Sequence, residues 1–159
     1  MQWLKGRAIA LSLLVLVAML AGCARPTDTK IVPTPTGHET VSFPDENLET
    51  AIRDALSKPN GEEITGAELA GLTGLCAPDK GITDISGLEY CTSLTELALS
   101  GNQICDISPL VENHGLGSGD DLWLKGNNLD LRAGSEAMEN IRALEERGVR
   151  VHLHDEPTR

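Results

Sequence analysis

Histidine and acidic side chains gather near the C-terminal end of the chain, and these residue types could hold a metal ion. His152 and His154 are two residues apart, so on a strand both point the same way, and Asp155 and Glu156 follow directly. Zinc takes three or four such ligands in a tetrahedral arrangement. The sequence supplies two imidazoles and no second cluster nearby. It therefore predicts a solvated strand end, with no metal and no cofactor.

Cysteine is the other residue type here with chemistry of its own. Beyond Cys23 the chain carries Cys76, Cys91 and Cys105. Cys76 is expected to face outward from a strand, Cys91 to fill a core position, and Cys105 to flank an inward-facing isoleucine, so a disulfide among them is disfavoured. A catalytic cysteine also needs an oriented histidine base and an oxyanion site, and no residues are spaced to supply them. We therefore expect no catalytic residues, no enzymatic activity and no small-molecule substrate.

Composition narrows the class of partner. The 159 residues suit one domain with short appendages, and aromatic residues make up only 3%, which predicts an aliphatic core. The formal net charge is -11, from 13 basic and 24 acidic residues. A surface with this acidic excess repels a phosphate backbone, so the sequence predicts no nucleic-acid partner.

The N-terminus carries a targeting signal. Lys5 and Arg7 precede an apolar run from Ala8 to Leu20, which is short for a transmembrane helix. The run ends in Leu-Ala-Gly-Cys23, which resembles the bacterial lipoprotein signal, in which the cysteine receives a diacylglycerol before cleavage in front of it. Residues 1–22 are thus predicted to be a signal peptide and Cys23 the lipidation site. An ordinary signal peptide and a membrane span are the alternatives.

A proline- and threonine-rich segment follows, and residues 23–40 are predicted to be the lipidated cysteine and a disordered tether. The expected location is extracytoplasmic, with the N-terminal lipid anchoring the protein to the bacterial cell membrane or outer membrane.

Residues 41–72 have the pattern of a helical cap. Asp45 is a plausible N-cap for an amphipathic helix that ends at Lys58–Gly61, and apolar residues recur along it at three- and four-residue steps. Thr65 and Glu68 form a capping-box pattern that opens a short second helix ending near Leu72.

Residues 73–154 contain a repeat. Residues 94–104 read LxxLxLxxNxI, and the later part of this pattern returns at residues 122–129. The middle leucines Leu75, Leu97 and Leu122 are 22 and 25 residues apart, within the period of leucine-rich repeats. In each coil the residue between two inward leucines faces outward, and asparagine suits the following corner because its amide both donates and accepts hydrogen bonds.

Three stretches carry a resemblance to a known family: FPDENLETAIRDAL, ITDISGLEYCTSLTELALSGNQICDISPL and NHGLGSGDDLWLKGNNL. Through them, residues from about 41 to 153 resemble a bacterial leucine-rich repeat domain of the internalin-like type. The resemblance implies an α/β fold: a short, curved, right-handed solenoid with a parallel sheet on its concave side. It also implies a surface that binds proteins. The last stretch departs from the pattern by three extra residues and a glycine-rich loop, Gly115 to Gly119.

The C-terminal part is expected to close the solenoid with a helix and a strand. Ser135 to Arg147 has an apolar helical face, and Gly148 is placed to end the helix. Val149, Val151 and Leu153 then alternate as inward residues of a last strand. Residues 155–159 are predicted to be a tail.

Strand alternation also predicts which residues reach a partner on the concave face. Trp123 lies at the centre of this surface, beside Ala98 and either Arg150 or His152. The full set of candidate binding residues is Glu96, Ala98, Asp121, Trp123, Lys125, Arg150 and His152. Trp123 either packs on its neighbours along the sheet or anchors a partner. The sequence therefore predicts a protein-binding module of unknown partner, and the alternative is a structural spacer or assembly component of the envelope without a binding site of its own.

Overall fold

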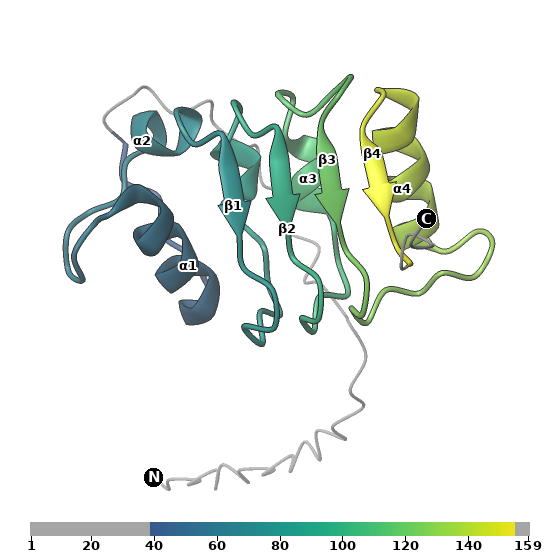
Figure 1. Ribbon diagram of the computed structural model, residues 1–159, viewed down its shortest axis with the longest axis horizontal. Coiled ribbons are helices and arrows are strands. Elements are labelled where there is room, and N and C mark those ends of the chain that lie inside the picture. Colours follow the sequence, from purple (N-terminus) through teal and green to yellow (C-terminus); the bar gives the residue numbers. More distant parts are fainter. Residues whose placement is uncertain (1–38, 155–159) are drawn as a thin grey trace, which may run out of the picture.

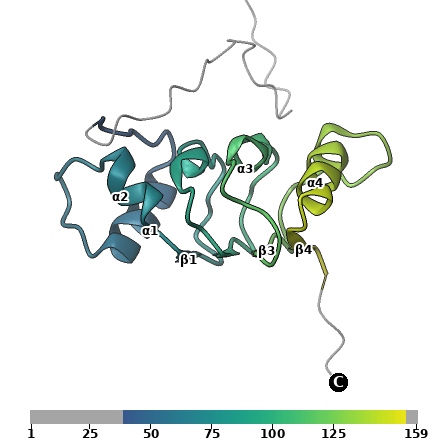
Figure 2. The ribbon, with the colours of Figure 1, turned by 90° about the horizontal axis from the view of Figure 1, so that it is seen from above.

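The computed structural model describes residues 39–154, and in this part of the chain four short strands form one parallel sheet (Figure 1). The strands stand in the order β1-β2-β3-β4, so each is the spatial neighbour of the strand before it in the sequence. Figure 2 shows the sheet on one side of the molecule and the helices of the repeats on the other. This arrangement confirms the predicted α/β fold. The strands are β1 (Gly74–Cys76), β2 (Glu96–Ala98), β3 (Asp121–Trp123) and β4 (Arg150–His152).

Two helices form the N-terminal cap, as predicted. Helix α1 (Glu46–Leu56) begins after Asp45, whose side chain accepts hydrogen bonds from the first-turn amides, and it packs against β1. Helix α2 (Gly66–Ala70) begins after Thr65 with a complete capping box. Because α1 lies beside β1, it covers the edge at which the sheet starts.

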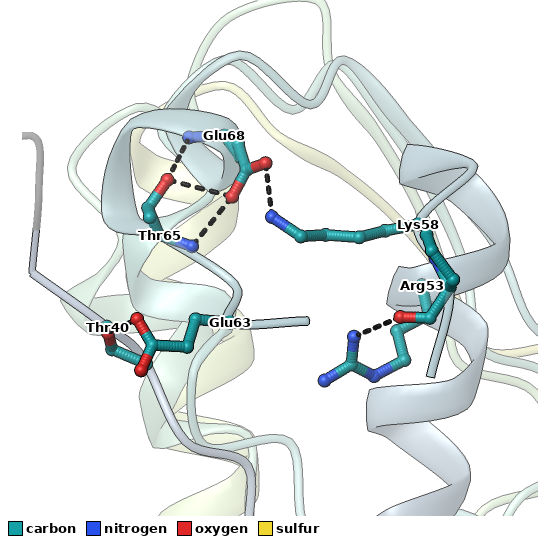
Figure 3. A network of polar contacts seen from close by, with 7 residues as sticks. Thr40, Arg53, Lys58, Glu63, Thr65 and Glu68 are labelled. Carbon is teal, nitrogen blue, oxygen red and sulfur yellow. Dashed lines mark hydrogen bonds and ion pairs between the residues drawn. The ribbon is translucent and has the colours of Figure 1, made fainter. Parts of the chain in front are cut away.

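Ion pairs and hydrogen bonds hold the loop between these two helices (Figure 3). Lys58 Nζ donates to Glu68 Oε1 at 2.5 Å, and the amide of Thr65 donates to Glu68 Oε2 at 2.8 Å. Arg53 Nη1 donates to the carbonyl of Pro59 at 3.0 Å. The bond from Lys58, followed by those from Thr65, lowers the pKa of Glu68 to about 2. The loop is therefore fixed to both helices it joins.

The cap begins two residues earlier than the composition predicts. Glu39 and Thr40, assigned above to the tether, are joined to the segment before α2. The amide of Gly66 donates to the carbonyl of Glu39 at 2.9 Å, and Thr40 Oγ1 donates to Glu63 Oε2 at 3.1 Å. These contacts depend on pairing with a segment more than twenty residues away, which a proline- and threonine-rich composition does not reveal.

Aliphatic side chains fill the space between the sheet and the helices. The central residue of each strand points inward, and Leu75, Leu97, Leu122 and Val151 stand side by side in register. Leu97 and Leu122 are completely buried. Phe43 is the one aromatic residue of the buried core cluster, as the composition predicts. The inward register of the repeat is therefore the predicted one.

Asparagines close the corners after β2 and β3. Asn102 Oδ1 accepts from the amides of Lys80 and Ile82, both at 3.0 Å, and its Nδ2 donates to the carbonyls of Ala77 and Leu99, both at 2.9 Å. All four groups belong to backbone that the bend leaves without a strand partner. Three of these groups, those of Ala77, Lys80 and Ile82, lie in the coil that begins with β1. Asn102 therefore also serves this preceding coil, in which Lys80 stands at the asparagine position.

The side opposite the sheet carries a 3₁₀ turn (Leu88–Tyr90), helix α3 (Ser108–Glu112) and helix α4 (Glu136–Glu146). Only α4 was predicted as a helix, and Ser135 caps it while Gly148 follows it at φ +90°. The irregular loop before β3 packs closely on the segment that leads into β2. A Cβ on Gly115 would lie 1.9 Å from the carbonyl oxygen of Thr92, so only glycine fits there.

The predicted signal peptide, Cys23 and the tether as far as residue 38 lie outside the described residues, as does the tail. Between residues 39 and 154 no helix is both long enough and apolar enough to cross a membrane. Cys76 and Cys91 are both free, so no disulfide joins these two cysteines to each other or to Cys105. Burial raises the pKa of the Cys91 thiol to about 12, so it is a core residue rather than a nucleophile.

Candidate functional site

Two rows of side chains cross the outer face of the sheet, the face turned away from the helices. The strand register places Gly74, Glu96, Asp121 and Arg150 in a first row. A second row consists of Cys76, Ala98, Trp123 and His152. Neighbouring strands lie about 4.8 Å apart, so residues next to each other in a row are within contact distance. Six of the seven candidate binding residues are thus brought together on one face.

Asp121 is the electrostatic centre of the half of this face formed by β3 and β4. Arg150 Nε donates to Asp121 Oδ1 at 2.7 Å, and a second guanidinium nitrogen pairs with Oδ2. The same guanidinium donates to the carbonyl of Gly119 at 2.9 Å, and His152 Nε2 lies 3.0 Å from Asp121 Oδ1. Hydrogen bonding by Arg150, and then by His152, holds the pKa of Asp121 far below its usual range. This carboxylate is therefore already engaged within the protein.

Trp123 is held by its neighbour on β4. Its ring stacks on the ring of His152, with centroids 5.1 Å apart and planes 12° from parallel. Because His152 also touches Asp121, it joins the tryptophan to the charged row beside it. The indole is half-buried and held in one orientation, which lowers the entropy lost when a partner binds.

The prediction of a solvated strand end is wrong for His152. Its side chain is only 19% exposed, because Trp123 covers one face of the imidazole and Asp121 contacts its edge. His154 is exposed, as predicted. Within residues 39–154 no three His, Cys, Asp or Glu side chains come together in a way that could hold a metal ion.

The other half of the face, formed by β1 and β2, has a different character. Cys76 and Glu96 are exposed, and Gly74 and Ala98 offer little or no side chain. Among the described residues the Glu96 carboxylate takes part in no ion pair or hydrogen bond, in contrast with Asp121. The two halves of the face therefore differ: the side chains over β1 and β2 are mostly small, and those over β3 and β4 form a rigid aromatic and charged cluster.

Lys125 is the candidate residue that joins neither row. It follows β3 by two residues and is exposed at the corner, where its carbonyl accepts a hydrogen bond from the amide of Gly101 at 2.8 Å. Sequence reasoning left Arg150 and His152 as alternative neighbours of Trp123, and the register selects His152. It missed the pairing of Asp121 with Arg150. A signal for it existed, because Asp121 precedes Trp123 by two residues and Arg150 precedes His152 by two.

Comparison with known proteins connects this fold to one group of bacterial proteins. No family model matches the sequence. Internalin H of Listeria monocytogenes is 43% identical over 65 residues, which are 40% of this chain and 12% of that protein. The solved structure of an internalin (inlF) from the same species has 33% identity and a TM-score of 0.57 over 70% of this chain and 30% of its own. The globular part of this chain is an internalin-like leucine-rich repeat domain.

Two further solved internalins of Listeria monocytogenes agree with this identification. Internalin C2 has 32% identity and a TM-score of 0.53, covering 66% of this chain and 48% of its own. The functional domain of InlJ has 25% identity and a TM-score of 0.57, covering 77% and 26% respectively. The internalin-like domain described here thus spans less than half the length of these relatives.

Proposed function

We propose that this chain is an extracytoplasmic protein-binding module, held at a bacterial membrane by lipid on Cys23, and that the outer face of its sheet is the binding surface. The observation that carries the proposal is the Trp123 ring, which is half-buried, stacked on His152 and surrounded by charged side chains. Tryptophan and arginine are enriched among the residues that dominate binding energy, and their energy is greatest where they are held rigidly. The internalin-like architecture supports this proposal, which involves no catalysis.

The test of this surface begins with crosslinking of the full-length protein in its native membrane to identify what it contacts. The affinity of that purified partner is then measured for the wild-type protein and for Trp123→Ala. We expect the substitution to weaken binding by about 1 kcal/mol or more, which is about fivefold in the dissociation constant. Leu131→Ala is the matched control, because Leu131 is 42% exposed but lies in the loop before α4. Its affinity should equal that of the wild type.

A structural spacer is the second candidate function, because a face only four strands wide offers a small area. Unchanged affinity of both Trp123→Ala and Asp121→Lys would move the contact away from the sheet and favour this alternative. Circular dichroism of both variants establishes that the fold is retained.

The lipid anchor is tested separately. Cys23→Ala removes the thiol that would carry the diacylglycerol, so the protein should leave the membrane fraction and appear in the soluble envelope fraction. Mass spectrometry of the wild-type protein should show a mature N-terminus at Cys23 with lipid attached. An unmodified Cys23, or a mature chain starting elsewhere, contradicts the anchor and leaves the binding surface unaffected.

A further inference from the structure

The indole of Trp123 has one covered face and one open face. His152 stacks on the β4 side of the ring, and on the β2 side the residue in register is Ala98, which extends only a methyl group. Since β2 lies directly beside β3 (Figure 1), the open face of the ring looks over β2. The next residue along this row is Cys76, which is also small and is exposed.

A carboxylate stands beside this open face. Glu96 is two residues before Ala98 on β2, so both side chains project from the same side of the sheet. Glu96 is exposed, and within residues 39–154 its carboxylate forms no ion pair or hydrogen bond. Arg150, which lies on the same row, is already held by Asp121 and by the carbonyl of Gly119. The surface thus combines an aromatic ring with one open face (Trp123), small side chains beside it (Ala98 and Cys76) and a carboxylate without an ion-pair partner in the described part of the chain (Glu96).

This combination fits a cation with a flat or aliphatic body. A guanidinium placed over the face of an indole is attracted by the electron density of the ring, and tryptophan is the strongest aromatic partner for this contact. The same guanidinium can donate two parallel hydrogen bonds to a carboxylate. An anionic group would meet Glu96 and the acidic excess of the chain, and an apolar group would leave Glu96 desolvated without a partner.

We propose that the open face of Trp123, together with Glu96 and the small side chain of Ala98, receives an arginine side chain of the partner protein. This inference rests on the proposed function, because it names the chemistry of the partner at the same surface. Asp121 then has a positioning role. It engages Arg150 and His152 and so holds Trp123, while Glu96 meets the partner's charge.

The experiment uses the protein purified in detergent, and Trp123 reports binding by fluorescence. Trp3 lies in the predicted signal peptide and is changed to Phe, so that Trp123 is the only tryptophan even in molecules that keep this segment. The probe is an acetylated peptide in which glycine alternates with arginine. Matched peptides carry lysine or neutral citrulline in place of arginine. We expect a saturable change in Trp123 emission with the arginine peptide, weaker binding of the lysine peptide, and no binding of the citrulline peptide.

Substitutions separate a local contact from general attraction to an acidic protein. Glu96→Gln should weaken binding of the arginine peptide about threefold or more. Glu145→Gln is the matched control, since Glu145 is exposed on α4, on the opposite side of the molecule, and the change in net charge is the same. It should bind like the wild type. Calorimetry with Trp123→Leu, which has no indole to report fluorescence, should show that binding is lost.

The inference is overturned by equal loss of affinity in Glu96→Gln and Glu145→Gln, by equal binding of the arginine and citrulline peptides, or by equal binding of the arginine and lysine peptides. The first two indicate non-specific association, and the third indicates a simple charge contact. If the purified partner depends on Trp123 but the arginine peptide fails, only this inference falls. If the affinity of the partner is the same for the wild type and for Trp123→Ala, both this inference and the proposed binding surface are wrong.

Discussion

Asp45 uses both oxygens of its carboxylate to join the cap to the first repeat. Oδ1 accepts hydrogen bonds from the amides of Asn47 and Leu48 at 2.9 and 3.0 Å. Oδ2 accepts from the amide and the hydroxyl of Thr83, both at 2.8 Å. The side chain is buried, and a carboxylate buried in this way is stable only because several donors surround it. A single residue therefore both starts α1 and fixes its place beside the repeats.

This arrangement predicts that acid weakens the fold. Burial opposes ionisation of Asp45, but the hydrogen bonds from Thr83, Leu48 and Asp84 outweigh it and lower its pKa. A lowered pKa in the folded state means that the stabilisation is fully present above the unfolded value of about 4, and that it is lost as the pH falls through the folded value. Denaturant titrations between pH 7 and pH 3 should therefore show a falling free energy of unfolding.

Asp45→Asn should be less stable than the wild type at pH 7 and should lose less stability on acidification. Asp54→Asn is its control, because Asp54 is exposed on α1 and its carboxylate forms no hydrogen bond or ion pair within the described residues. It should keep the acid dependence of the wild type. Equal acid slopes for the wild type and Asp45→Asn would show that other carboxylates cause the loss.

The roles of single residues could be predicted from the sequence where a side chain bonds to backbone groups close to it in the chain. Asp45 as an N-cap, the capping box of Thr65 and Glu68, and Asn102 at a corner were all predicted, because each satisfies backbone groups a few residues away. The second function of Asp45 could not be predicted, since Thr83 is 38 residues away. The stacking of Trp123 on His152 likewise depends on a register that spacing alone did not decide.

At the scale of the elements, strand alternation determines which side chains enter the core. Leu97 is completely buried and Ala98, next to it, is half-buried on the outer face. Leu97→Ala should lower the free energy of unfolding by roughly 2–5 kcal/mol, because it leaves a cavity in the core. Ala98→Ser should change it by less than about 1 kcal/mol. Comparable losses for the two variants in denaturant titrations would contradict the strand register.

The elements that the sequence did not reveal are those without a periodic pattern of their own. The 3₁₀ turn at Leu88–Tyr90 and helix α3 are too short to repeat an apolar spacing, and their backbone is shaped by packing on neighbouring coils. Asn113 shows this dependence. It is fully buried, and its Nδ2 donates to the carbonyls of Leu88 and Cys91, which belong to the coil before it.

At the scale of the whole molecule, each coil contacts chiefly the coils on either side of it, so stability is built up from interfaces between neighbours. The interface of α4 with α3 is the last of these in the described part of the chain, and Arg147 forms hydrogen bonds across it. Its guanidinium donates to the carbonyls of Asn113 and Val111, both at 3.0 Å, and to that of Leu110 at 3.4 Å. These carbonyls are at the C-terminal end of α3, where a positive charge is favourable. Because β4 follows α4 directly, this contact also holds the strand that carries Arg150 and His152.

Arg147→Met, which keeps the length of the side chain but removes its donors, should therefore loosen the C-terminal cap before the rest of the fold. We expect hydrogen exchange of the α4 and β4 amides to become about tenfold faster, equivalent to roughly 1–2 kcal/mol, while the β1 and β2 amides keep their protection. Arg142→Met is the matched control, since Arg142 is exposed on the same helix and its guanidinium forms no hydrogen bond or ion pair within the described residues. Faster exchange spread evenly over all four strands would show instead that the domain opens as one unit. In that case the partner-binding cluster at Trp123 could not be loosened separately from the core.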